Sequence, residues 1–166
     1  RQSPLSFRAH RNLAKVLWRQ GWVDEAEFLF KRTLTIGEEA WGLDGRQVAP
    51  SLRGLANFYF KQGRYAEAEP LFRRLLSIGE SILGPDHPNL AGIINNLGAI
   101  YFLRGEISKA EPLFRRSLAI WEKSLSPNHP ILATGLENLA EIYIAHGKPD
   151  EAKRLFERAE QIRASQ

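Results

Sequence analysis

The residue types that carry most catalytic chemistry are few in this 166-residue chain, and cysteine is absent. Disulfides, thiolate zinc sites and cysteine nucleophiles are therefore excluded. Two of the four histidines, His87 and His129, stand 42 residues apart in DHP and NHP segments, which marks them as loop residues of a repeat. His10 and His146 have no companion at the spacing of a metal site. The sequence predicts no catalytic centre, no metal site and no cofactor, and we expect a protein that is not an enzyme.

A stripe of positive charge near the start of the chain is the strongest candidate for binding. Its cations are spaced three, four and four residues apart, which places them on one face of a helix: Arg8, Arg11, Lys15 and Arg19. The first 20 residues contain no acidic residue to neutralise them. Like charges four residues apart disfavour a helix, which favours a negatively charged ligand. The competing explanation is a solvated end helix, or acidic residues in a segment before Arg1.

Composition places the chain among folded, water-soluble proteins. It is 43% hydrophobic and 25% charged, and no apolar run reaches the length of about 18 residues that a membrane span needs. The net charge of +4 is compatible with an acidic partner, although the 23 basic and 19 acidic residues are mostly interspersed. The start of the chain has no signal-peptide pattern, and we expect a cytoplasmic location. Because the chain contains no methionine, we expect it to be a fragment of a longer protein.

The elements that must position these residues recur with a period of 42 residues. Several columns are identical or nearly identical in all four copies, and the leucine column is followed by a column of small residues. The columns are Leu13, Leu55, Leu97 and Leu139; Ala14, Ala56, Gly98 and Ala140; Gly21, Gly63, Gly105 and Gly147; Ala26, Ala68, Ala110 and Ala152; Phe30, Phe72, Phe114 and Phe156; and Ile36, Ile78, Ile120 and Ile162.

Within each repeat the apolar residues recur every three or four positions, which predicts two helices joined at the glycine column. Asp24 and Ser108 have the pattern of N-caps for second helices, Gly84 and Pro85 mark a helix end, and Pro88 opens the next helix. The predicted fold class is all-α. The expected helices span residues 5–19, 24–41, 47–61, 66–83, 88–103, 108–125, 130–145 and 150–163.

Two kinds of phrase carry a family resemblance. NLGAIYFLRG at 96–105 and EAEPLFRR at 67–74 resemble the tetratricopeptide motif, and LGPDHPNLAGIINNLG at 83–98 resembles its kinesin light chain variety. The resemblance covers nearly the whole chain and implies a right-handed superhelical solenoid of four helix-turn-helix repeats. Chain length and the 42-residue period predict a single domain, residues 1–166, with repeats near 5–45, 46–87, 88–129 and 130–166.

In the tetratricopeptide family the stripe positions of each first helix line a concave groove. The resemblance therefore implies a protein-interaction module that binds a partner segment, acidic where it meets repeats 1 and 2, and a charge gradient from basic to acidic along the groove. Kinesin light chain grooves take up short acidic segments that contain an aromatic residue. The candidate partner-binding residues are Arg8, Arg11, Lys15, Trp18, Arg19, Arg53, Asn57, Phe60, Lys61, Asn95, Asn96, Ala99, Phe102, Glu137 and Glu141. Arginines that recur on the second helices, Arg32, Arg74 and Arg116, are expected to face outward.

Two other classes of function remain open. A structural scaffold could form if the basic N-terminal end of one copy docked head to tail on the acidic C-terminal end of another. Nucleic-acid binding suits the net positive charge, but no recognised nucleic-acid-binding motif accompanies it, so we expect neither nucleic acid nor a membrane as partner.

Overall fold

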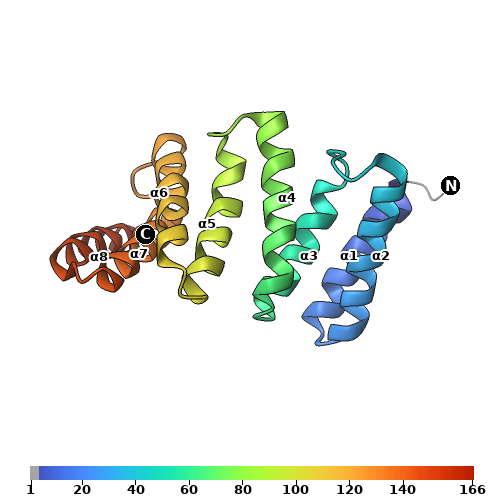
Figure 1. Ribbon diagram of the computed structural model, residues 1–166, viewed down its shortest axis with the longest axis horizontal. Helices are drawn as coiled ribbons and strands as arrows, with labels where there is room; N and C mark the ends of the chain where they lie inside the picture. The colour runs from blue at the N-terminus through green and yellow to red at the C-terminus, as the bar shows by residue number, and fades with distance from the viewer. Residues whose placement is uncertain (1–3) are drawn as a thin grey trace. The chain divides into compact units, whose positions relative to one another are not determined.

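The computed structural model describes residues 4–166, which form helices joined by short connections (Figure 1). No strand occurs in this part of the chain, so the expected all-α class is confirmed. The helices are α1 (Pro4–Arg19), α2 (Val23–Trp41), α3 (Ala49–Lys61), α4 (Tyr65–Leu83), α5 (Pro88–Leu103), α6 (Ile107–Ser124), α7 (Pro130–Ala145) and α8 (Pro149–Ala164).

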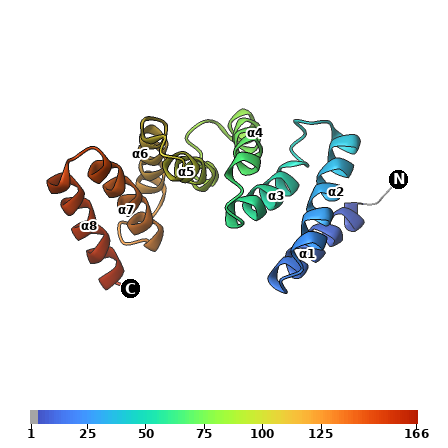
Figure 2. The same cartoon turned by 60° about the horizontal axis from the view of Figure 1, so that its bottom comes forward.

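The chain divides into two compact units, which are described separately. Unit 1 comprises residues 1–82 and unit 2 comprises residues 83–166. In unit 1, α1 packs against α2, and α2 packs against α3; in unit 2, α5 packs against α6, α6 against α7, and α7 against α8. Figure 2 shows the α1–α2 and α7–α8 pairs as antiparallel hairpins. The candidate residues of the first two repeats lie in unit 1, and those of the last two lie in unit 2.

Glycine makes each turn inside a hairpin, as the sequence predicts. At Gly21 the backbone φ angle is +84°, a conformation that other residues rarely adopt. The turn is closed by a hydrogen bond of 2.9 Å from the Trp22 N–H to the Leu17 carbonyl. A positive φ angle also occurs one, two and three periods later, at Gly63, Gly105 and Gly147.

Histidine caps the first helix of each repeat in unit 2. The Nδ1 atom of His87 accepts a hydrogen bond of 3.2 Å from the Asn89 N–H, and Pro88 is the first residue of α5. His129 does the same for the Ile131 N–H at 3.3 Å. An N-cap acceptor satisfies one of the free N–H groups at a helix start. These two histidines thus have a structural role, as their spacing predicts.

Two expected caps are wrong. Asp24 and Ser108 lie inside the first turns of α2 and α6, and neither helix has a side-chain cap at its start. The glycine turns lead directly into these helices, where the Ala26 N–H donates to the Trp22 carbonyl and the Ala110 N–H donates to the Glu106 carbonyl. The other helix ends lie within two residues of the expected positions.

The small-residue column lies where helices approach most closely. Ala14, Ala56 and Ala140 are completely buried. A Cβ atom placed on Gly98 would lie 2.8 Å from the Phe114 ring, closer than van der Waals contact allows. We expect the leucine column to lie in the core, and Leu55, Leu97 and Leu139 are buried. Leu13 is 48% exposed, so the expectation is wrong for the first member of the column.

The sequence predicts that three second-helix arginines face outward, but two of them form hydrogen bonds with the preceding repeat. The Arg74 guanidinium donates to the Glu38 carboxylate and to the Leu43 carbonyl, both in the preceding repeat. In unit 2, Arg116 donates to the Pro85 carbonyl at 2.5 Å. The expectation of an exposed side chain is met at Arg32, whereas Arg74 and Arg116 are half-buried.

None of the described helices is long and apolar enough to cross a membrane.

Candidate functional site

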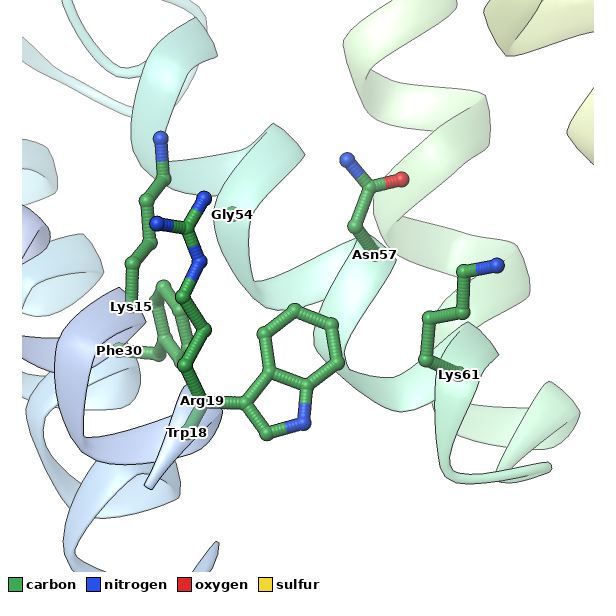
Figure 3. A pocket seen from close by; sticks show the side chains of 7 residues that line it. All are labelled: Lys15, Trp18, Arg19, Phe30, Gly54, Asn57 and Lys61. Atoms are coloured by element: carbon green, nitrogen blue, oxygen red, sulfur yellow. The ribbon is translucent and has the colours of Figure 1, made fainter. Parts of the chain in front are cut away.

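A pocket of about 500 Å³ opens in unit 1 between the α1–α2 hairpin and α3. This volume lies within the usual range of ligand sites, roughly 300–1,000 Å³. The lining residues are Lys15, Trp18, Arg19, Phe30, Gly54, Asn57 and Lys61 (Figure 3). Five of them are candidates from the sequence: Lys15, Trp18, Arg19, Asn57 and Lys61.

The floor of the pocket is aromatic. The half-buried Trp18 ring meets Phe58 edge-on at a centroid distance of 5.4 Å and Phe30 at 6.4 Å. Such edge-to-face contacts hold rings in defined orientations. Phe30 is itself 1% exposed. The Trp18 side chain is thus fixed by the core and presents a rigid apolar surface to the pocket.

Gly54 leaves the pocket open above Phe30. A Cβ atom at this position would lie 3.0 Å from the Phe30 ring. Any larger side chain would therefore press on the ring or fill the space above it. Phe30 and Gly54 are the two lining residues that the sequence prediction missed. The available signal was the break in the column of Asn12, Asn96 and Asn138, where Gly54 replaces asparagine.

The rim of the pocket is polar and basic. Lys15 and Arg19 come from α1, whereas Asn57 and Lys61 come from α3, and Figure 3 shows the two pairs on opposite sides of the Trp18 ring. Lys15, Arg19 and Lys61 are exposed. None of these three cations has a hydrogen-bond or ion-pair partner among the described residues, and no carboxylate lines the pocket. The rim can therefore offer three unshared positive charges and one amide.

The remaining candidates of unit 1 do not line this pocket. Arg8, Arg11 and Arg53 extend the positive charge along α1 and α3. Burial and the nearby charge of Arg8 lower the pKa of Arg11, which is half-buried. Phe60 packs against Phe72 of α4 at 6.2 Å, so its ring contributes to the core between α3 and α4.

The candidates of unit 2 are partly engaged inside that unit. Glu137 accepts two hydrogen bonds from the Arg163 guanidinium, at 2.9 and 2.7 Å. The Asn95 Oδ1 atom accepts a 2.9 Å bond from Asn138 of α7. Phe102 lies 6.5 Å from the Phe114 ring centroid, Asn96 and Ala99 are half-buried, and Glu141 is exposed. A second pocket, of about 410 Å³ between α7 and α8, is lined by none of these candidates.

Net positive charge is confined to unit 1. This unit contains 13 basic and 9 acidic residues, whereas unit 2 contains 10 of each. The difference of four charges equals the net charge of the chain. No group of three potential metal ligands occurs among the described residues. The pocket of unit 1 is therefore the place where the sequence stripe, the aromatic floor and the charge excess coincide.

Residues 47–122 and 91–165 each match one tetratricopeptide repeat family, and residues 8–28 match another family of tetratricopeptide repeats. Together the first two matches cover more than half of the chain. No curated protein matches it.

Solved structures similar to this chain include other helical-repeat proteins. BtubC (BKLC) from P. vanneervenii is 26% identical with a TM-score of 0.88, and the match covers 99% of this chain and 66% of that one. A putative kinesin light chain of Podosopora anserina, with nearly identical TPR-like repeats, is 27% identical with a TM-score of 0.83, and 99% and 78% of the two chains are covered. The apo form of RapI shares the fold at 20% identity and a TM-score of 0.82, with 99% and 58% covered. All three structures confirm a helical-repeat solenoid, and the family match together with the putative kinesin light chain confirms the kinesin light chain-like type.

Proposed function

Because the chain belongs to the tetratricopeptide repeat family, we propose that it is a protein-interaction module whose unit 1 pocket binds an acidic segment of a partner protein. The family and the similar structures support protein–protein interaction as the general function. The finer assignment rests on the pocket itself. Its decisive feature is the set of three unpartnered cations around an aromatic floor.

The two sides of the pocket suit different parts of an extended segment. Carboxylates of the segment would lie near Lys15 and Arg19 on one side and near Lys61 on the other. Since no acid of the pocket competes for these cations, a ligand carboxylate gains their attraction without breaking an existing ion pair. The Asn57 amide can both donate to and accept from a peptide backbone.

An apolar side chain of the segment would occupy the space above Trp18 and Phe30. The position of Gly54 makes this space available, and the rigid rings can bury such a side chain with little loss of their own freedom. The ligand class is therefore an acidic peptide segment with one large apolar or aromatic residue. This chemistry agrees with the expectation drawn from the kinesin light chain resemblance.

A direct test measures the binding of a fluorescein-labelled peptide that has one tryptophan flanked by glutamates. We expect the triple variant Lys15→Glu, Arg19→Glu, Lys61→Glu to lose about tenfold or more in affinity, because three attractive charges become repulsive. The circular dichroism spectrum should stay unchanged, since the three side chains are exposed.

A matched control reverses three exposed cations away from the pocket: Arg46→Glu, Lys148→Glu, Arg154→Glu. It changes the net charge equally, and these three residues have no ion-pair partner among those described. We expect it to retain most of the affinity. An equal loss in both triple variants would mean general charge attraction and would contradict the pocket assignment. So would equal binding of a peptide in which glutamine replaces every glutamate.

A further inference from the structure

The first helix of unit 1 exposes an apolar face that the same positions bury in later repeats. Leu13 is 48% and Val16 is 45% exposed. One period later, Leu55 is 4% and Phe58 is 0% exposed. In unit 2, the corresponding exposed fractions are 7% and 0% for Leu139 and Ile142.

These positions are buried in later repeats because a second helix packs against the first helix of the next repeat. In unit 1, α3 packs against the second helix α2, and in unit 2, α7 packs against the second helix α6. Phe58 of α3 contacts both helices of the preceding hairpin, with its ring 5.4 Å from Trp18 and 5.5 Å from Phe30. Figures 1 and 2 show no described helix of unit 1 on the side of α1 and α2 that faces away from α3.

The second-helix arginines provide an independent observation of the same missing contact. Arg74 of α4 binds Glu38 on the preceding second helix, and Arg158 of α8 binds Glu122 at 2.7 Å in the same way. Arg32 occupies this repeat position on α2. It is exposed and has no hydrogen-bond or ion-pair partner among the described residues. Within the described part of unit 1, Arg32 and the apolar face of α1 thus lack the same neighbour, which in the later repeats is the preceding second helix.

The second helices of this chain define the chemistry of that neighbour. They present large apolar side chains to the next first helix: Phe30 lies against Gly54, and Leu118 and Trp121 lie against Gly135. They also carry a glutamate eight residues after the conserved phenylalanine, Glu38 after Phe30 and Glu122 after Phe114. The α1 sequence contains no acid, so a negatively charged neighbour is also electrostatically complementary to it.

We propose that Leu13, Val16 and Arg32 form a docking surface for an amphipathic α-helix of the second-helix type, with the apolar residues of the helix on α1 and its glutamate on Arg32. Asn12 stands where α3 has Gly54, so a phenylalanine of the docked helix would meet a larger side chain there than Phe30 meets at Gly54. In α7 the corresponding Asn138 donates a hydrogen bond to Asn95 of α5, the preceding first helix. None of the three docking residues lines the unit 1 pocket, so this surface and the peptide pocket can be tested separately.

The test uses the full chain and a labelled peptide of residues 23–45, which contains α2 and the start of the following loop. A hydrocarbon staple on its exposed face keeps the peptide helical, and Asn replaces Phe30 in it to meet Asn12. We expect saturable binding that is lost in the variant Leu13→Gln, Val16→Gln. Because both residues are exposed, this variant should keep the circular dichroism spectrum of the parent chain.

Two controls give the test its specificity. The variant Leu43→Gln, Leu103→Gln removes apolar side chains elsewhere that are even more exposed, at 62% and 55%, and should bind the peptide normally. Arg32→Glu should weaken binding by about fivefold, the upper range for one exposed ion pair, and a peptide with Glu38→Arg should restore it. Absence of binding, equal binding to both double variants, or failure of the charge exchange would each overturn the proposal. So would self-association of the parent chain through Leu13, because a second copy would then be the occupant.

Discussion

At the scale of single residues, a missing side chain opens the pocket. Gly54 stands in a column that otherwise contains asparagine, and the space this leaves is bounded by the Phe30 ring. The surrounding cations supply attraction over a screening length of about 8 Å at physiological ionic strength, but the cavity decides where a ligand can sit. The pocket therefore depends as much on Gly54 as on Lys15 or Arg19.

Replacing Gly54 with asparagine should close the pocket. The new Cβ atom would begin 3.0 Å from Phe30, and the amide would extend into the space above the ring. We expect a clear loss of affinity for the tryptophan-containing acidic peptide and a destabilisation of about 1–3 kcal/mol, the usual cost of overpacking. Titration and thermal melting measure both effects. Gly92→Asn is the control, since a Cβ there meets nothing within 4 Å. Unchanged peptide affinity in Gly54→Asn would show that the ligand does not occupy this space.

Gly98 and Gly92 differ in how much space they leave for a larger side chain, and therefore in how much such a side chain should destabilise the fold. A Cβ on Gly98 would lie 2.8 Å from Phe114, whereas one on Gly92 would meet open space. Gly98→Leu should therefore lower the free energy of unfolding by about 1–3 kcal/mol more than Gly92→Leu, because α5 and α6 must move apart. Thermal or urea unfolding monitored by circular dichroism provides the comparison. Equal stability of the two leucine variants would contradict the close packing of this hairpin.

The sequence predicts individual pocket residues where their position is shared by all repeats. Lys15, Trp18 and Asn57 were found because the period assigns them to equivalent faces of first helices. Phe30 belongs to a phenylalanine column that all four repeats share, and it is both a core residue and part of the pocket floor. Periodicity identifies what the repeats have in common, so it cannot by itself locate a cavity that one exceptional residue creates.

At the scale of elements, Glu27 connects the first hairpin to the second. Its carboxylate accepts hydrogen bonds from the Tyr59 hydroxyl at 3.1 Å and from the Arg64 guanidinium at 2.5 Å, and it pairs with Lys31 at 2.6 Å. These contacts join α2 to α3 and to the turn before α4. The Arg64 hydrogen bond is the main cause that lowers the pKa of Glu27 from 4.5 to about 2, with Lys31 and Tyr59 contributing.

This lowered pKa predicts how stability responds to acid. A carboxylate whose pKa is lower in the folded state stabilises the fold above its unfolded pKa and loses that effect as the pH falls through the folded pKa. The contribution of Glu27 should therefore be complete above pH 4.5 and disappear as the pH approaches 2. We expect Glu27→Gln to lower the melting temperature at pH 7 and to reduce its pH dependence between 4.5 and 2. Parallel curves for the two proteins in this interval would exclude Glu27 as the source.

Helix boundaries show where element prediction succeeds and fails. Gly84, Pro85 and Pro88 were correctly read as a helix end and a helix start, because these residues constrain the backbone directly. Asp24 and Ser108 were misread as caps, because glycine turns already lead the chain into α2 and α6. The cross-repeat contacts of Arg74 were not predicted either, since local spacing does not reveal which carbonyl or carboxylate lies across a junction.

At the scale of the whole molecule, the two terminal helices differ in chemistry. In α6, Leu118 and Trp121 lie against Gly135 of the next first helix. The corresponding positions of α8 are Glu160, which is exposed, and Arg163, which is bound to Glu137. The outer face of α8 is therefore charged where α6 is apolar, whereas α1 exposes Leu13 and Val16.

This difference gives a prediction for the scaffold alternative, in which copies dock head to tail. The parent chain should sediment as a monomer over a wide range of concentrations, because docking α8 on α1 would bury Glu160 against apolar side chains at a cost of several kcal/mol. Glu160→Leu restores the residue found at Leu118 and should produce association that increases with concentration. Glu157→Leu removes the same charge at a position where the other repeats have exposed basic residues, Lys31, Arg73 and Arg115, and should remain monomeric. Adding Leu13→Glu to the Glu160→Leu variant should abolish association, since the apolar face on α1 is lost. Association of the parent chain, or equal association of the two single variants, would contradict this account of the charged α8 face.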